Sequence, residues 1–271
     1  MKHHLSFDVE DVYQGFKERG IAGWSKDVYG EKKRINEILD LLDEHNQKAT
    51  FFVLTEVLQD YKQEVLEMKK RGHEVASHGH EHLRIWRRNE SEFSEDIKRS
   101  KDLLEGLISS EVKGYRAPGF SLNKSTLWAV DLIQNAGFTY SSSSSLTEGQ
   151  VPLNLSTPIS GNLSGKLIEF PATSFRILGV DARICGGFYF RALPLQITKL
   201  VMRRQESMNK PTNLYLHPFE FEDHPVKIKS NFKVSVIRYH NTDKTKSRLE
   251  QLLQCYSFTS FEETLSRLPR K

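Results

Sequence analysis

The stretch Leu5-Ser-Phe-Asp-Val-Glu-Asp11 lies near the start of the chain and decides how the rest is interpreted. Residues 5–9 are rich in apolar side chains, which predicts a first β-strand. Three carboxylates, on Asp8, Glu10 and Asp11, lie at the end of this strand. In parallel α/β barrels the active site gathers at the carboxyl ends of the strands. The stretch therefore predicts a strand and one side of a site.

Further along, short β-rich runs alternate with amphipathic helical stretches. Strands are predicted at residues 49–54, 73–77, 113–117, 138–142, 167–170 and 213–217. Helices are predicted at residues 35–42, 57–68, 93–107, 125–136, 193–208 and 242–254. Parallel strands need crossover connections, and helices of these lengths supply them. The pattern predicts an α/β fold with a largely parallel sheet, closed or nearly closed into a barrel.

The expected organisation is one domain over residues 1–271. Residues 141–165 contain a five-serine run, several Asn and Gly residues and two prolines, and they predict a long surface excursion. Residues 242–271 predict a C-terminal helical extension. Ser91 is a candidate N-cap for the helix that follows it.

Composition sets limits on the function. The chain has 271 residues, a net charge of +4 and no long block of basic residues, which argues against nucleic acid as a partner. Cys185 and Cys255 cannot form a disulfide framework. No apolar run reaches the roughly 18 residues that a transmembrane helix needs. The first residues lack the apolar segment of a signal peptide, so a cytoplasmic location is expected.

The strongest local signal is Ser77-His-Gly-His-Glu-His82, which holds three of the ten histidines of the chain. His78 and His82 are four residues apart, so one helical turn would place both imidazoles on one side, where they can bind one metal ion. His80 would point away and is a poor third ligand. The alternative is a polar loop with incidental histidines.

The acidic run at the first strand can complete such a site. Along a strand, Asp8 and Glu10 face the same way and Asp11 the opposite way, unless the chain has already turned. Two histidines and one carboxylate would make a three-ligand site with an open position for water. The alternative for this run is a solvated acidic loop.

Two further segments place polar residues at strand ends. In Gly114-Tyr-Arg-Ala-Pro-Gly-Phe-Ser121, Arg116 ends a strand before a Pro-Gly turn and could orient a carboxylate through paired hydrogen bonds. In Leu214-Tyr-Leu-His-Pro-Phe-Glu220, His217 ends a strand and could transfer a proton. Taken alone, Arg116 could equally be a surface arginine, and His217 is better explained as a core histidine.

Together, in this order, these pieces resemble the polysaccharide deacetylase family, also called carbohydrate esterase family 4 or the chitooligosaccharide-deacetylase homology domain. The resemblance runs from Leu5 to about Glu220. It implies a deformed (β/α) barrel in which Asp8 is the catalytic base and His78 and His82 are the metal pair. Further matches to the family's motifs are Arg116, Pro118 and His217.

The Asp-Val-Glu-Asp opening, with Glu169-Phe-Pro171 and Gly186-Gly-Phe-Tyr-Phe-Arg191, is similar to a branch associated with bacterial exopolysaccharide gene clusters. Two departures stand out. The family's adjacent aspartates are separated here, which leaves both Glu10 and Asp11 open as metal ligands. The family's fourth motif is not identified, and Asp181 is a candidate partner for His217.

The resemblance implies an N-deacetylase acting on N-acetylhexosamine residues of a glycan or glycan precursor. Its ion would be Zn²⁺, with Co²⁺, Mn²⁺ or Ni²⁺ as alternatives, and His217 would protonate the departing amine. Pro118, Phe188 and Tyr189 are expected to bind substrate.

Two other functions stay open at this point. One is a metal-independent amidohydrolase of the same fold, acting on a small cyclic or linear amide. The other is a catalytically silent glycan-binding module that uses aromatic residues such as Trp86, Phe188 and Tyr189. The sugar, its carrier and the oligomeric state are not indicated by the sequence.

Overall fold

The computed structural model describes the chain apart from residues 22–27, 145–154, 157–166, 178–179, 226 and 269–271. Two compact units are distinguished. The first contains residues 1–49 and 173–259, and the second contains residues 50–172 and 260–271. Most of the second unit is therefore inserted between the two sequence segments of the first.

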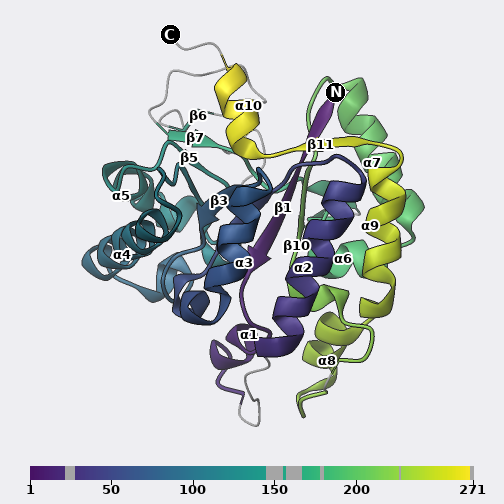
Figure 1. Ribbon diagram of the computed structural model, residues 1–271, viewed down its shortest axis with the longest axis horizontal. Helices are drawn as coiled ribbons and strands as arrows, with labels where there is room; N and C mark the ends of the chain where they lie inside the picture. Colours follow the sequence, from purple (N-terminus) through teal and green to yellow (C-terminus); the bar gives the residue numbers. More distant parts are fainter. Residues whose placement is uncertain (22–27, 145–154, 157–166, 178–179, 226, 269–271) are drawn as a thin grey trace. The chain divides into compact units, whose positions relative to one another are not determined.

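The first unit is built on strand β1 (Lys2–Val9), which pairs in parallel with β10 (Asn213–Leu216) and β11 (Ser257–Thr259) (Figure 1). All residues of β1 after Lys2 are buried. One face of β1 carries Leu5 and Phe7, while polar residues alternate with them on the other face. Strands β8 (Phe175–Ile177) and β9 (Val180–Ala182) form a separate antiparallel pair. Asp8 lies on this polar face and is buried.

Helices surround these strands. The longest is α2 (Val28–Glu44), whose apolar stripe of Ile35, Ile38, Leu39 and Leu42 is completely buried. This helix packs against the 3₁₀ turn η6 (Pro218–Phe221), which directly follows β10 and His217. The other helices of this unit are α1 (Gln14–Lys17), α6 (Gly187–Ala192), α7 (Leu195–Ser207), α8 (Phe232–Tyr239), η7 (Thr242–Lys244) and α9 (Thr245–Leu253).

The second unit contains a parallel sheet in the order β2-β3-β4-β5-β7-β6. These strands are β2 (Thr50–Val53), β3 (Glu74–Ser77), β4 (Gly114–Tyr115), β5 (Tyr140–Ser141), β6 (Leu155–Ser156) and β7 (Leu167–Glu169). Ser77 pairs with Tyr115, Tyr115 with Ser141, and Ser141 with Glu169. The carboxyl ends of four strands are thus in register.

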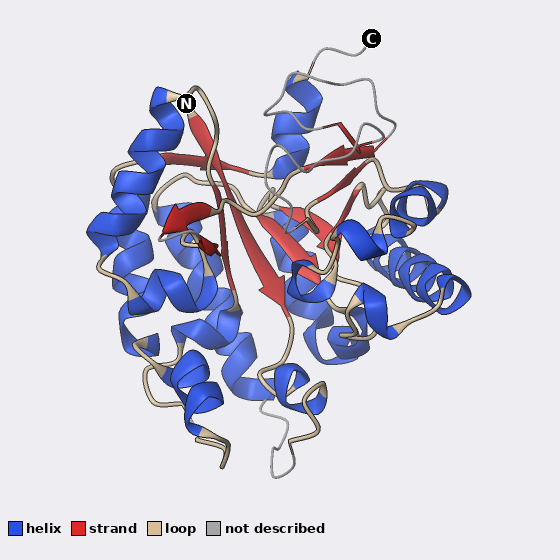
Figure 2. Ribbon diagram, turned by 180° about the vertical axis from the view of Figure 1, so that it is seen from behind, coloured by secondary structure: helices blue, strands red, loops and turns tan. Residues whose placement is uncertain are grey.

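Helices α3 (Leu58–Lys70) and α4 (Glu90–Ile108) pack against β3, and α5 (Ala129–Asn135) packs against α4 (Figure 2). Phe52, Ala76, Tyr140, Phe170 and Phe261 form an apolar cluster, to which α10 (Phe261–Arg267) contributes the last residue. The short 3₁₀ turns are η1 (Thr55–Val57), η2 (Ile85–Arg87), η3 (Pro118–Phe120) and η4 (Lys124–Thr126).

The described strands and helices confirm the predicted alternation, with three local corrections. Helix α4 is capped by Asn89 instead of Ser91, because Asn89 and Glu92 form a reciprocal capping box. Residues 242–271 are not purely helical, since they include β11, which pairs with β1. Residues 141–144, predicted to open a surface excursion, are buried. Most of the remaining excursion lies outside the described residues.

Among the described residues, no helix combines the length and apolar character needed to cross a bilayer.

Candidate active site

In the first unit, the strand register brings two of the predicted catalytic residues together. Phe7 of β1 pairs with Leu216 of β10, so the next residues, Asp8 and His217, are neighbours at the carboxyl ends of two parallel strands. His217 Nε2 lies 3.8 Å from Asp8 Oδ2. A carboxylate and an imidazole at this separation form a candidate pair of proton-transfer groups.

Glu220 and Arg191 support His217 from behind. The Nδ1–H of His217 donates to Glu220 Oε2 (3.0 Å), and the backbone N–H of His217 donates to the same oxygen (2.9 Å). Arg191 Nε donates to the other oxygen, Glu220 Oε1, at 2.7 Å. Side-chain exposure is 2% for Arg191 and 1% for Glu220. Because Nδ1 faces an acceptor, Nε2 is the nitrogen directed toward Asp8.

This arrangement shifts the pKa of both groups. Burial alone would raise the pKa of Glu220, but the charges of Arg191 and His217 lower it to about 2. Burial alone would lower the pKa of His217, but the hydrogen bond and charge of Glu220, with the charges of Glu10 and Asp8, raise it. These charges therefore favour the cationic form of His217 more than burial alone would.

The two carboxylates after β1 have different surroundings. Glu10 and Asp11 are both buried. The charge of Glu10 acts on His217. The charge of Asp11 acts instead on Glu31. The pKa of Glu31 is raised to about 7, mainly by burial and to a smaller extent by the charge of Asp11, although Arg34 acts in the opposite direction. Glu10 is thus grouped with His217, and Asp11 with the ion pairs of α2.

In the second unit, His78 and His82 lie in a loop that follows β3, so the predicted helical turn is wrong. Gly79 between them has φ +84°, a left-handed conformation that breaks any helix and is natural for glycine. The loop still brings the two imidazoles together, with ring centroids 5.6 Å apart. His78 Nδ1 donates to the backbone carbonyl of Arg116 at 2.8 Å. That bond leaves Nε2 of His78 as the nitrogen that is available to a metal ion.

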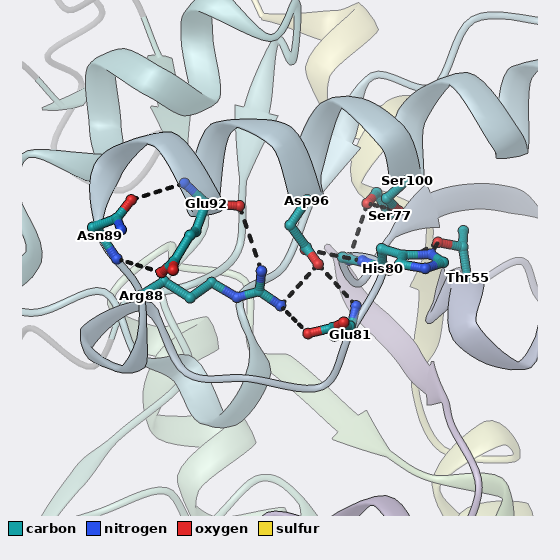
Figure 3. Close-up of polar contacts among 10 residues, drawn as sticks. Thr55, Ser77, His80, Glu81, Arg88, Asn89, Glu92, Asp96 and Ser100 are labelled. Carbon is teal, nitrogen blue, oxygen red and sulfur yellow. Dashed lines mark hydrogen bonds and ion pairs between the residues drawn. The ribbon is translucent and has the colours of Figure 1, made fainter.

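The remaining residues of this loop are fixed by hydrogen bonds (Figure 3). His80 Nδ1 lies 2.9 Å from the hydroxyl of Thr55, and its backbone N–H donates to Asp96. The backbone N–H of Gly79 donates to the hydroxyl of Ser77. The ring of His80 is therefore engaged with Thr55.

Arg116 comes one residue after the row of paired strand ends and is fully buried. Its Nε donates to the carbonyl of Ser142 (3.1 Å), and Nη2 donates to the hydroxyl of the same residue (2.9 Å). The guanidinium carbon lies 4.0 Å from the ring centroid of Phe52. The serine run therefore holds Arg116, and Glu169 holds the run by accepting the N–H groups of Ser143 and Ser144.

The predicted substrate-binding residues lie in separate units. Pro118 is buried and begins η3 in the second unit. Phe188 and Tyr189 lie on α6 of the first unit, with ring centroids 5.7 Å apart and Tyr189 39% exposed. Gly186, just before α6, runs so close to β10 that a Cβ there would lie 2.3 Å from Tyr215.

Sequence patterns do not identify Glu220 and Arg191 as the groups that support His217. The side chain of Asp181, the predicted partner, lies outside the described residues. A local signal for Glu220 exists, because His217-Pro-Phe-Glu220 has the spacing of a capping box with proline at the first turn. Arg191 lies 29 residues from Glu220 and gives no local signal.

The donor types suit a divalent metal. Glu10, His78 and His82 offer one carboxylate and two imidazoles, a set that Zn²⁺ accepts. The carbonyl of Arg116 fixes the tautomer of His78, as outer partners of metal-binding histidines generally do. On this chemistry the residues present fit a metal ion of the predicted kind.

Comparison with known proteins adds two family matches and several relatives. Residues 23–141 match the polysaccharide deacetylase family, and residues 148–266 match a domain of unknown function, DUF3473. The peptidoglycan-N-acetylglucosamine deacetylase of Bacillus cereus is 32% identical over 96 residues, which cover 35% of this chain and 35% of that protein. The chain spans less than half the length of the curated relatives it matches.

Solved structures resemble the chain over nearly its whole length. A Mycobacterium smegmatis protein assigned as a polysaccharide deacetylase gives a TM-score of 0.57 at 17% identity, covering 100% of this chain and 93% of that one. A CE4 family pseudoenzyme from Bacillus anthracis gives 0.52 at 13% identity, covering 97% and 65%. These likenesses confirm the predicted α/β fold with a parallel sheet of this type. Over residues 23–141, the chain is similar to the polysaccharide deacetylase family.

Proposed function

We propose that this protein is a metal-dependent N-deacetylase that removes acetyl groups from N-acetylhexosamine residues of a glycan or glycan precursor. The observation that carries the proposal is the Asp8–His217 pair, with Nε2 and Oδ2 3.8 Å apart and His217 supported by Glu220. Hydrolysis of an amide needs a group that takes a proton from water and one that gives a proton to the amine. This pair provides both.

In this proposal His78, His82 and Glu10 hold the ion. Glu10 is chosen over Asp11 because alternation along β1 and the residue after it places Glu10 on the same side as Asp8, and Asp11 on the opposite side. When bound, a divalent ion would polarise the acetyl carbonyl and make a water molecule more acidic. Zn²⁺ is the expected ion, since two imidazoles and a carboxylate suit it.

The residues of the chain have separate roles. Asp8 takes the proton of the attacking water, with Arg116 orienting its carboxylate. His217 donates its Nε2 proton to the sugar amine, because an amide anion is too basic to leave unprotonated. Glu220 keeps the Nδ1–H of His217 in place, so that Nε2 faces the reaction.

The substrate class is proposed from the family. The Bacillus cereus relative is named for peptidoglycan N-acetylglucosamine. For this chain we propose a bacterial surface polysaccharide or its precursor, with Phe188, Tyr189 and Pro118 lining the sugar. Tyr189 on α6 is exposed enough to stack on a sugar ring.

The test is acetate release from N-acetylglucosamine oligomers by chelator-treated protein, with and without added Zn²⁺ or Co²⁺. Metal-stimulated acetate release, lost in Asp8→Asn, is expected. Equal release after metal removal would instead identify a metal-independent amidohydrolase. Oligomer binding without acetate release under every condition would identify a catalytically silent glycan-binding module.

A further inference from the structure

The side chain of Asp96, on α4, forms hydrogen bonds with the backbone of the loop between His78 and His82. Its Oδ2 accepts the backbone N–H of His80 at 3.0 Å, and its Oδ1 accepts that of Glu81 at 2.9 Å (Figure 3). The side chain is only 7% exposed. A buried carboxylate that takes two adjacent backbone N–H groups fixes both the position and the direction of that backbone.

The cation of Arg88 offsets the free-energy cost of burying this carboxylate. Arg88 Nη2 lies 2.9 Å from Asp96 Oδ1 and 3.0 Å from Glu81 Oε2. A buried charge is costly unless it is paired and hydrogen-bonded, and Asp96 has both kinds of partner. Arg88 lies between the loop and α4 in the sequence, so the pair also ties the loop to the start of that helix.

The opposite side of the loop is held by η1. The backbone N–H of Thr55 donates to the carbonyl of Gly79 (3.0 Å), and that of Glu56 donates to the carbonyl of His80 (2.9 Å). The three residues between His78 and His82 are therefore hydrogen-bonded on two sides, to Asp96 and to η1. At Gly79 the space is full, because a Cβ there would lie 2.9 Å from Asp96 Oδ2.

We propose that Asp96, compensated by Arg88, is a positioning residue that sets the spacing of His78 and His82 for a metal ion. This inference rests on the proposed function. Metal–nitrogen bonds of about 2.0–2.1 Å tolerate errors of about 0.2 Å, so a backbone shift of a few tenths of an ångström between the ligands weakens binding. Asp96 acts through the backbone and does not itself bind the ion.

The test compares Asp96→Asn with Asp102→Asn, which makes the same chemical change at an exposed position of the same helix. The Zn²⁺ dissociation constant is measured by competition with a chromophoric chelator, and the Co²⁺ form is followed by its visible absorption. Asp96→Asn is expected to weaken binding roughly 10–100-fold, as loss of an outer partner of a metal ligand does. Asp102→Asn should match the wild type.

Hydrogen exchange of the His80 and Glu81 amides in metal-free protein gives a second measurement. Exchange of at least one of these amides should rise about tenfold or more in Asp96→Asn, since asparagine keeps only one acceptor oxygen for the two N–H groups. Arg88→Gln is the milder variant if Asp96→Asn does not fold, and it should shift both readouts in the same direction.

The outcomes are separable. If wild type binds metal, and Asp96→Asn and Arg88→Gln show the same metal affinity and the same amide exchange as wild type, the inference about Asp96 is wrong. The proposed function would not be affected by that result. Failure of wild type and Asp102→Asn to bind any metal would contradict the proposed function, and the metal role of Asp96 with it.

Discussion

The two units orient their candidate functional histidines by different means. In the first unit, His217 is held by a side chain, Glu220, which is held in turn by the buried cation of Arg191. In the second unit, His78 is held by a backbone carbonyl, that of Arg116. Arg116 itself is anchored through the backbone and hydroxyl of Ser142.

The difference has a physical consequence. A carboxylate partner stabilises a positive charge on the imidazole and raises its pKa, as Glu220 does for His217. A carbonyl partner fixes the tautomer without adding a charge, which suits an imidazole that must stay neutral to bind a metal. The two environments therefore suit the roles proposed above, an acid for His217 and a metal ligand for His78.

The largest effect is expected from the metal ligands. His78→Ala and His82→Ala should each lose bound metal and activity together while the fold persists, because each removes a proposed ligand. Atomic emission measures the metal content, and circular dichroism shows whether the fold persists. His80→Ala is the control within the same loop, since its ring faces Thr55, and it should keep its metal. Unchanged metal content in the first two variants would contradict the ligand assignment.

Asp8→Asn should leave the metal in place and slow acetate release by about 10²–10⁴-fold, the usual contribution of a general base. Glu10→Gln should weaken metal binding, whereas Asp11→Asn should affect it much less. The measurements are kcat on N-acetylglucosamine oligomers and metal affinity for all three variants. If Asp8→Asn alone lost the metal, the roles of these carboxylates would have to be reassigned.

Glu220→Gln tests the charged support of His217 directly. Because Glu220 raises the pKa of His217, its neutral replacement should lower that pKa. The alkaline limb of kcat/KM, where the acid loses its proton, should then move to lower pH. The rate should fall roughly 10–100-fold, part of the contribution of a general acid.

Asp223→Asn, an exposed carboxylate three residues further on, is the matched control and should leave the pH profile unchanged. A shift of the alkaline limb to higher pH in Glu220→Gln, or no shift, would show that His217 is not the group that titrates there.

Ser142→Ala should have the smallest effect, less than about tenfold in kcat. Arg116 would lose one hydrogen bond, worth about 1.5–3 kcal/mol for a charged donor, but this loss is expected mainly in the free energy of unfolding, because the bond to the carbonyl of residue 142 still holds the guanidinium in place. Parallel kinetics of Ser142→Ala and Glu220→Gln check the order. A larger loss of kcat in Ser142→Ala than in Glu220→Gln would show that the support of Arg116 in the second unit matters more than that of His217 in the first.

Sequence patterns predict most of the strands and helices, because these elements have local hydrophobic periodicity. They also selected Asp8 and His217, whose proximity follows from the β1–β10 register. They failed for the conformation around Gly79, where spacing suited a helix but tertiary hydrogen bonds impose a loop. The ion pair of Arg191 and Glu220 depends on packing between distant segments, which no local pattern encodes.

The pairing of β1 with both β10 and β11 has a consequence for biosynthesis. Val9 and Asn213 are separated by more than 200 residues, so these partners are translated long after β1. At about 5–20 residues per second, the delay is on the order of 10–40 s. Throughout that time β1 cannot complete the pairing seen in the finished protein. The first unit is thus expected to complete its strand pairing only after β10 and β11 have been synthesised.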